Sequence, residues 1–169
     1  MDEPIYQSLN KLSYGLYIVT SSDERQKNGF IVNTAFQVSA DPAKIAVCVC
    51  KNSFTHGIIE KSRVFNVMPL EQNTPMVFIG NFGFRTGRNF DKFAKVASTA
   101  GKNGCPVVKE HTLCCIEVRV EQTADVGTHT LFIGEITAGH VFDTQKTPLT
   151  YEYYHTVIKG KTPPGATHL

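Results

Sequence analysis

The chain has 169 residues, which suits a single domain that buries about two thirds of its unfolded surface and needs neither disulfides nor a metal to fold. Its 17 basic and 15 acidic side chains leave a formal net charge of +2 and form no basic block, so the composition argues against a nucleic-acid-binding protein. The N-terminus lacks the basic and apolar segments of a signal peptide, and no apolar run approaches the roughly 20 residues of a membrane span. We therefore expect one cytoplasmic domain over residues 1–169 with no membrane partner.

The first third of the chain alternates apolar stretches with turn signals. Hydrophobic periodicity predicts a short amphipathic helix over residues 4–13, packed on the body of the domain, and a first strand over 16–20. A polar loop then leads to Asn28-Gly29, a pair that suits a hairpin turn into a second strand rich in β-branched and aromatic residues. Asp41-Pro42 is a turn signal, and the apolar run 45–50 predicts a strand buried on both faces.

The rest of the chain predicts more strands than helices. The expected elements are a helix over 54–62, a strand over 64–68, a short helix capped by Thr74 with Pro75 in its first turn, a Gly-rich loop over 80–88, a short helix over 89–96 exposing Asp91 and Lys92, strands over 112–123 and 129–142 joined by a turn at 125–128, and a helix over 148–159. Residues 160–169 are expected to be a flexible tail. About six strands with irregularly inserted helices argue against a doubly wound α/β fold and for an antiparallel barrel.

The five cysteines are an odd set, and their spacing suits neither disulfides nor a metal. Cys48 and Cys50 share one face of a strand, Cys114 and Cys115 point to opposite faces, and Cys105 lies in a Gly-rich loop. There is no Cys-x-x-Cys pair, so a zinc or dithiol site is not expected. The cysteines are better explained as small buried hydrophobes, which implies a reducing compartment.

The loop over residues 51–55 changes character abruptly, from an apolar strand to the polar sequence Lys51-Asn52-Ser53. A strand that runs into such a loop at a helix N-terminus is a natural anion site, because unpaired N–H groups, hydroxyls and an ammonium meet there and the helix dipole favours negative charge. The alternative is that Ser53 only caps the helix, since serine is a preferred N-cap residue. The residues of this loop leave both interpretations open.

Several segments resemble the flavin reductase-like family, which has the FMN-binding split barrel and includes the flavoredoxins. The segments that carry the resemblance are residues 14–20, 29–42, 51–55, 87–93 and 127–135. The end of the chain, over residues 148–155 and 159–163, is similar to the flavin reductase half of high-molecular-weight rubredoxins. Together these segments cover nearly the whole chain.

The resemblance implies a mainly β fold, an antiparallel, Greek-key-like FMN-binding split β-barrel with short helices inserted. It also implies noncovalently bound FMN, a homodimer, and electrons from NADH or NADPH or from a protein donor. The residues that match the flavin ring strand are Asn33, Thr34, Ala35 and Phe36; those that match the strand beneath the ring are Cys48, Val49 and Cys50; those that match the phosphate loop are Lys51, Ser53 and Thr55. With a phosphate to bind, the anion interpretation of this loop is favoured, and capping by Ser53 remains compatible with it.

Two further kinds of residue are candidates. The guanidinium of Arg85 or Arg88 could bind a phosphate bidentately, and Arg88 is favoured because it lies in the matching Gly-Arg segment, although both could be solvated loop residues. His129 matches the histidine at the open face of the flavin in members that use a nicotinamide. Here Thr128 replaces the acidic residue that usually precedes this histidine, so a residue that merely begins a strand is an equal alternative.

We therefore expect an FMN-dependent oxidoreductase that passes electrons from NAD(P)H through bound FMN to free flavin or to a small redox protein such as a rubredoxin. No catalytic triad is needed, because the flavin carries such chemistry. One alternative is an FMN-binding electron carrier, or a flavin-binding module, without its own NAD(P)H activity. Another is a pyridoxamine-phosphate-oxidase-like barrel, which shares the architecture but not these motifs.

Overall fold

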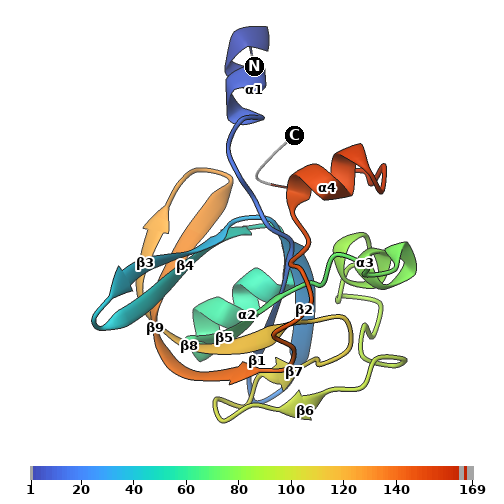
Figure 1. Ribbon diagram of the computed structural model, residues 1–169. Coiled ribbons are helices and arrows are strands. Elements are labelled where there is room, and N and C mark those ends of the chain that lie inside the picture. The colour runs from blue at the N-terminus through green and yellow to red at the C-terminus, as the bar shows by residue number, and fades with distance from the viewer. Residues whose placement is uncertain (1, 164–165, 167–169) are drawn as a thin grey trace.

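The computed structural model describes residues 2–163 and 166. The main element of the fold is one seven-stranded sheet with the strand order β2-β1-β5-β8-β9-β4-β3, which is strongly curled (Figure 1). Its strands are β1 (Tyr17–Ser22), β2 (Lys27–Val32), β3 (Ala35–Ala40), β4 (Ala43–Cys50), β5 (Val64–Pro69), β8 (Cys114–Asp125) and β9 (His129–Val141). A small second sheet pairs β6 (Thr99–Ala100) with β7 (Pro106–Val107).

Every pair of neighbouring strands is antiparallel, and the expected mainly antiparallel barrel with short helices is confirmed. In the described part of the chain, β2 and β3 are the two edges of the large sheet and no ladder joins them, so the barrel is not closed. Both edges come from the single strand expected between residue 29 and Asp41-Pro42, which is interrupted at Asn33-Thr34. This interruption opens the barrel.

The expected hairpin turn at Asn28-Gly29 is wrong. Both residues lie inside β2 and pair with β1. The chain reverses earlier, because the Asp23 carboxylate accepts hydrogen bonds from the backbone N–H groups of Arg25 and Gln26 at 2.9 and 3.0 Å. An aspartate side chain that satisfies two turn amides fixes the reversal, and Asn28 becomes a buried strand residue.

Four helices accompany the sheet in the described residues: α1 (Glu3–Leu9), α2 (Phe54–Ser62), α3 (Met76–Gly83) and α4 (Tyr151–Thr156). The expected packing of the first helix on the body is wrong, since α1 buries no residue and projects away from the sheet (Figure 1). Pro75, and not Thr74, occupies the N-cap of α3, because the Thr74 hydroxyl donates to the carbonyl of Glu71 at 2.5 Å. α3 also extends to Gly83, into the expected Gly-rich loop.

Residues 89–96 form turns and not the expected helix. The Asp91 carboxylate accepts a hydrogen bond from the backbone N–H of Phe93 at 2.9 Å, which fixes one such turn. Lys92, expected on the surface, is only 3% exposed. Because this segment forms turns and not a helix, Lys92 points inward and not toward solvent.

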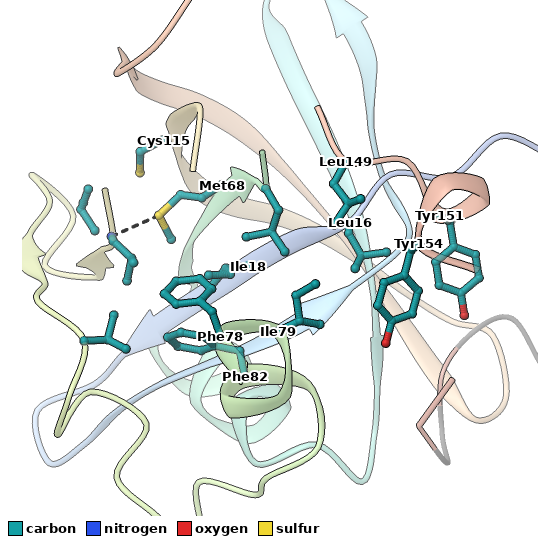
Figure 2. Packing of buried hydrophobic residues seen from close by; sticks show 14 residues of the cluster. Leu16, Ile18, Met68, Phe78, Ile79, Phe82, Cys115, Leu149, Tyr151 and Tyr154 are labelled. Carbon is teal, nitrogen blue, oxygen red and sulfur yellow. Dashed lines mark hydrogen bonds between the residues drawn. The ribbon is translucent and has the colours of Figure 1, made fainter. Parts of the chain in front are cut away.

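Two apolar cores lie on the two faces of the curled sheet. Inside the barrel, Val47, Phe65 and Phe132 pack with Ile59 of α2. Outside it, α3 and α4 pack on β1 and β5 through a cluster that Figure 2 shows, in which Phe78 and Phe82 of α3 lie against Ile18. α2 and α3 both contact the edge strand β2.

Glu117 of β8 is a carboxylate with 0% exposure. One of its oxygens accepts the backbone N–H of Asn103 at 2.9 Å, and the other accepts the ring N–H of His140 at 2.9 Å. Burial alone would raise the pKa of Glu117, but the N–H groups of Asn103 and Lys102 and the His140 ring outweigh burial and lower it. The charged form of Glu117 is thus the stable one.

None of the helices in the described part of the chain is both long and apolar enough to cross a membrane.

Candidate functional site

A cavity of about 380 Å³ lies at the opening of the barrel. Residues of β2 and β4 line it although these strands share no ladder in the described residues, and the other walls come from the start of α2, the end of α3 with residues 84–87, and α4. Cofactor and small-molecule sites typically have volumes of about 300–1,000 Å³ and mostly apolar linings with a few placed polar groups. The cavity is therefore large enough for a cofactor.

One end of the cavity lies at the N-terminus of α2. Ser53 is the N-cap, and its hydroxyl oxygen accepts the backbone N–H of Thr55 at 3.2 Å. The Thr55 hydroxyl in turn accepts a hydrogen bond from the Asn28 amide of β2 at 2.9 Å, which fixes α2 to the edge strand. Ser53 therefore caps the helix, while its own hydroxyl hydrogen remains available to a ligand in the cavity.

Residues 84–87 close this polar end. Gly87 packs directly on Asn28, and a Cβ at position 87 would overlap the Asn28 side chain. Arg85 consequently lies on the cavity wall, with its Cζ 4.2 Å from the centroid of the Phe90 ring. The ring supports an exposed guanidinium at the rim of the polar end.

Lys92 also lines the cavity, and it is buried. Its ammonium donates to the carbonyl of Phe82, at the end of α3, at 2.8 Å. Among residues 2–163 and 166 no carboxylate oxygen lies within 4.0 Å of this ammonium, whereas Lys44, Lys51 and Lys146 each have such a partner. Burial lowers the pKa of Lys92 to about 8.

The wall opposite β2 is made by β4 and the start of β9. Cys48 and Cys50 face the cavity from alternate positions of β4, and Cys50 pairs with His129. His129 is 8% exposed, and its Nδ1 lies 2.8 Å from the Thr128 hydroxyl. Burial raises the pKa of the Cys48 thiol, so this side chain stays neutral and makes the wall apolar.

The far end of the cavity is aromatic. Tyr151 and Tyr154 of α4 stack with their ring centroids 6.1 Å apart and lie next to Leu16 (Figure 2). The Tyr151 hydroxyl lies 2.7 Å from the Thr162 hydroxyl, and the Tyr154 hydroxyl donates to the carbonyl of Lys161 at 3.0 Å. Pro163 and Ala166 complete this wall. The expected tail over 160–169 falls partly outside the described residues, at 164–165 and 167–169.

Five residues favoured by the sequence line this cavity: Asn33, Cys48, Cys50, Ser53 and His129. Arg85, the less favoured of the two arginine candidates, lines it as well. Seven others do not: Thr34, Ala35, Phe36, Val49, Lys51, Thr55 and Arg88. Val49 is in the core, and the Lys51 ammonium is paired with Asp125 at 2.7 Å. Arg88 lies with its Cζ 5.5 Å from the ring centroid of Phe54, which does line the cavity. A cofactor contact by these seven remains a prediction.

Sequence reasoning missed Asn28, Lys92 and Tyr154 as cavity residues. The pair Asn28-Gly29 predicts a turn, because Asn-Gly is a strong short hairpin signal. Lys92 lies in a segment that resembles the family, but the helical interpretation placed it on the surface. The accumulation of tyrosines over residues 151–154 was the available signal for the aromatic end.

The flavin reductase like domain family matches residues 9–158, so the chain belongs to the flavin reductase-like family of oxidoreductases, as the sequence predicted. It is 47% identical over 161 residues, 95% of each chain, to the ferric-chelate reductase (NAD(P)H) of Archaeoglobus fulgidus. It is 41% identical over 157 residues to the high molecular weight rubredoxin of Moorella thermoacetica, covering 93% of this chain and 68% of that protein. A solved NADH:FAD oxidoreductase of Streptomyces globisporus shares the fold, with a TM-score of 0.78, 20% identity, and coverage of 86% of this chain and 85% of that one.

The residues of the cavity fit a flavin. Its apolar and aromatic walls suit a planar ring, and its polar end offers a helix N-terminus and a serine hydroxyl. Two cationic side chains, Arg85 and the buried Lys92, also line it. An anion at this end would supply the missing negative charge. The donor set therefore agrees with a flavin that carries a phosphate.

Proposed function

We propose that this protein is an FMN-dependent oxidoreductase that takes electrons from NADH or NADPH and delivers them to free flavin, a ferric chelate or a small redox protein. The observation that carries the proposal is the cavity at the barrel opening, apolar along its length and polar at the N-terminus of α2. Membership of the flavin reductase-like family indicates the class of cofactor. When bound, the flavin supplies hydride and single-electron transfer, so the chain has to hold it and leave one face accessible.

The chain's own residues divide this task. The Ser53 hydroxyl and the first-turn N–H groups of α2 would hold the phosphate, and Asn33 with the backbone of β2 and β4 would hold the ring. FMN is preferred to FAD because Gly87 packs on Asn28 and closes the polar end, which favours a ligand ending in one phosphate. His129, at the start of β9, is proposed to contact the electron donor.

The acceptor is proposed from the relatives. The Archaeoglobus relative is named for reduction of a ferric chelate, and the Moorella relative is a rubredoxin. A separate small redox protein would dock weakly and with charge steering, so turnover with an added rubredoxin should exceed turnover with oxygen and fall as salt rises. A rate that ignores both the carrier and the salt would favour reduction of free flavin.

A homodimer in a reducing compartment, the cytoplasm, completes the proposal. Two apolar surfaces support the dimer: α1 exposes Ile5 (52%) and Leu12 (57%) follows it, and β3 exposes Phe36 (49%) and Val38 (43%). The five cysteines are all free, which supports the reducing compartment. Light scattering at micromolar concentration should give twice the chain mass, and a monomer with bound FMN would contradict the dimer.

The test of the function is direct. The purified protein is titrated with FMN, FAD and riboflavin, and its flavin absorbance is then followed anaerobically after adding NADH or NADPH. FMN should bind more tightly than riboflavin, and one nicotinamide should bleach it. In His129→Ala, bleaching should slow while FMN affinity is unchanged. Tight FMN binding without bleaching would leave the electron-carrier alternative, which the Thr128 substitution favours.

A further inference from the structure

A short segment that follows α4 forms part of the aromatic end of the cavity. Residues 160–163, which we call the C-terminal strap, bind back onto Tyr151 and Tyr154 of α4 (Figure 2), and Pro163 lines the cavity together with both tyrosines. We propose that this strap retains the flavin, so that FMN is a resident cofactor and not a substrate exchanged at each turnover. The inference rests on the proposed function and deepens it by naming the segment that holds the cofactor in place.

The turn between α4 and the strap has its glycine at an unusual position. α4 ends at Thr156, and the backbone N–H of Gly160 donates to the carbonyl of Tyr154 at 2.9 Å. Lys159 has the left-handed conformation, with a φ of 60°, which glycine usually adopts at the end of a helix. The position that favours a glycine for its φ is thus occupied by a lysine, and the glycine comes one residue later. Gly160 therefore serves another purpose.

The Tyr154 ring requires that glycine. A Cβ at Gly160 would overlap the Cζ and both Cε atoms of the ring, so any other residue would push the strap away from α4. The next two residues of the strap are bound as well. The Tyr154 hydroxyl donates to the carbonyl of Lys161 at 3.0 Å, and the Tyr151 hydroxyl lies 2.7 Å from the Thr162 hydroxyl. Three successive residues of the strap are thus fixed on the two rings.

Termination of α4 is the competing explanation. The hydrogen bond of Gly160 completes a helix C-terminus, and a buried tyrosine hydroxyl needs a partner, so these contacts also stabilise α4. A helix cap, however, requires no residue beyond Gly160. The chain continues instead to Pro163, whose restricted φ makes a stiff wall at the cavity. The additional length therefore points to a ligand in the cavity.

The strap is suited to open and close around that ligand. Its residues are half-buried or exposed, and its hydrogen bonds to α4 can break without unfolding the large sheet. A flavin ring that contacts Tyr154 and Pro163 would stabilise the closed form, because it binds that form and not the open one. Changes in such contacts alter the dissociation rate of a ligand more than its association rate. The lifetime of bound FMN is therefore the quantity that the strap should control.

The test compares Gly160→Ala, whose methyl group displaces the strap from the Tyr154 ring, with Gly139→Ala in β9, where a Cβ would meet nothing within 4 Å. Each protein is loaded with FMN and rapidly diluted, and the recovery of flavin fluorescence gives the dissociation rate. In the unaltered protein, dissociation should be at least about 10-fold slower than turnover with a nicotinamide. Gly160→Ala should speed dissociation by about 10-fold, and Gly139→Ala by less than about 2-fold.

Limited digestion with trypsin measures the strap without any turnover. Lys159 and Lys161 are exposed and flank Gly160, so cleavage after them, identified by the mass of the shortened chain, reports opening of the strap. FMN should slow this cleavage by about 10-fold in the unaltered protein and by less than about 2-fold in Gly160→Ala. Tyr154→Phe removes only the hydroxyl that binds the Lys161 carbonyl, and it should speed FMN dissociation by about 3-fold.

The outcomes separate the explanations. If FMN leaves Gly160→Ala no faster than Gly139→Ala, or if FMN does not slow trypsin cleavage in the unaltered protein, the inference is overturned. If Gly160→Ala melts well below Gly139→Ala, Tyr154→Phe decides, and unchanged dissociation in that variant would assign the strap to stability alone. If the unaltered protein releases FMN faster than it turns over, FMN is a substrate, and the inference fails while the proposed function stands. If it binds no FMN, the proposed function itself fails.

Discussion

Glu117 and Lys92 are both buried charges, and the fold treats them in opposite ways. Glu117 has 0% exposure and accepts hydrogen bonds from Asn103 and His140, and its pKa is lowered, so that the charged form is favoured. Lys92 is 3% exposed with one hydrogen bond to a carbonyl, and its pKa is lowered to about 8, so that the charged form is disfavoured. The two shifts have the same direction but opposite meanings, because one group is an acid and the other a base.

This difference distinguishes a buried charge that stabilises the fold from one that is available to a ligand. A buried charge whose partners are all inside the chain fixes local structure, and here Glu117 fixes the loop around Asn103. A buried charge without an internal partner is a candidate for binding, because it costs stability in the empty protein. The four predictions that follow test this distinction, from the largest expected effect to the smallest.

Glu117→Ala should lower the free energy of unfolding by about 3–4 kcal/mol, because it removes a fully buried carboxylate and leaves the N–H groups of Asn103 and His140 without this partner. Urea denaturation measures the loss. His140→Ala is the control and should cost less, since the His140 side chain is 43% exposed. The contribution of Glu117 should be present above its ordinary pKa of 4.5 and be lost as the pH falls through its lower folded pKa. If Glu117→Ala lowers the free energy of unfolding by less than about 1 kcal/mol, Glu117 does not stabilise the fold as a buried, fully partnered charge should.

Lys92 should give the opposite pH dependence. Its pKa is about 8 in the folded protein against an ordinary 10.5, so between these values the unfolded chain binds more protons and stability rises with pH. The rise should approach about 3 kcal/mol in the flavin-free protein. Cys105 and Cys115, whose pKa values burial raises to about 11 and about 12, oppose it. The difference in the free energy of unfolding between the unaltered protein and Lys92→Met isolates the contribution of the lysine. If this difference does not change from pH 7 to 10, burial of Lys92 does not destabilise the folded protein.

Ser53 should separate capping from ligand binding. Ser53→Ala should cost about 1 kcal/mol of stability through the lost N-cap, whereas Ser53→Gly should cost only a few tenths. Both variants should weaken FMN by about 10-fold, because both lack the hydroxyl. Isothermal titration with FMN and riboflavin measures the second effect. If Ser53→Gly keeps full FMN affinity, the hydroxyl serves only the helix.

Lys51 should have the smallest effect. Its ammonium is paired with Asp125 at the surface and does not line the cavity. Lys51→Ala should therefore leave FMN affinity and melting temperature unchanged within error. Asp125→Ala, which frees the ammonium, is the matched variant. A tenfold loss of FMN affinity in Lys51→Ala would instead support the phosphate contact that the sequence predicts for Lys51.

The sequence predicted the architecture and part of the lining of the cavity, for a physical reason. β4 and the start of α2 are specified locally, by an apolar run and a serine cap, so Cys48, Cys50 and Ser53 were found where the cavity is. Asn28 and Lys92 depend on tertiary context. The Asp23 carboxylate, which accepts the backbone N–H of Gln26, places the chain reversal before β2 and not at Asn28-Gly29. Lys92, which the expected helix exposes, is buried in the structure. Short-range patterns carry no information on such contacts.

The interruption at Asn33-Thr34 has a consequence for the local opening of the sheet. The two strands on either side of it, β2 and β3, are the edges of the sheet, and edge strands normally open first because one side of each lacks a ladder. A ligand held between β2 and β4 would connect two strands that share no ladder in the described residues, since β2 is one edge of the sheet and β4 is the neighbour of the other edge, β3. Amide exchange in β2 and β3 should therefore slow far more on flavin binding than exchange in the central β5 and β8. In this barrel the cofactor would connect the two edges of the sheet, which no ladder joins in the described residues.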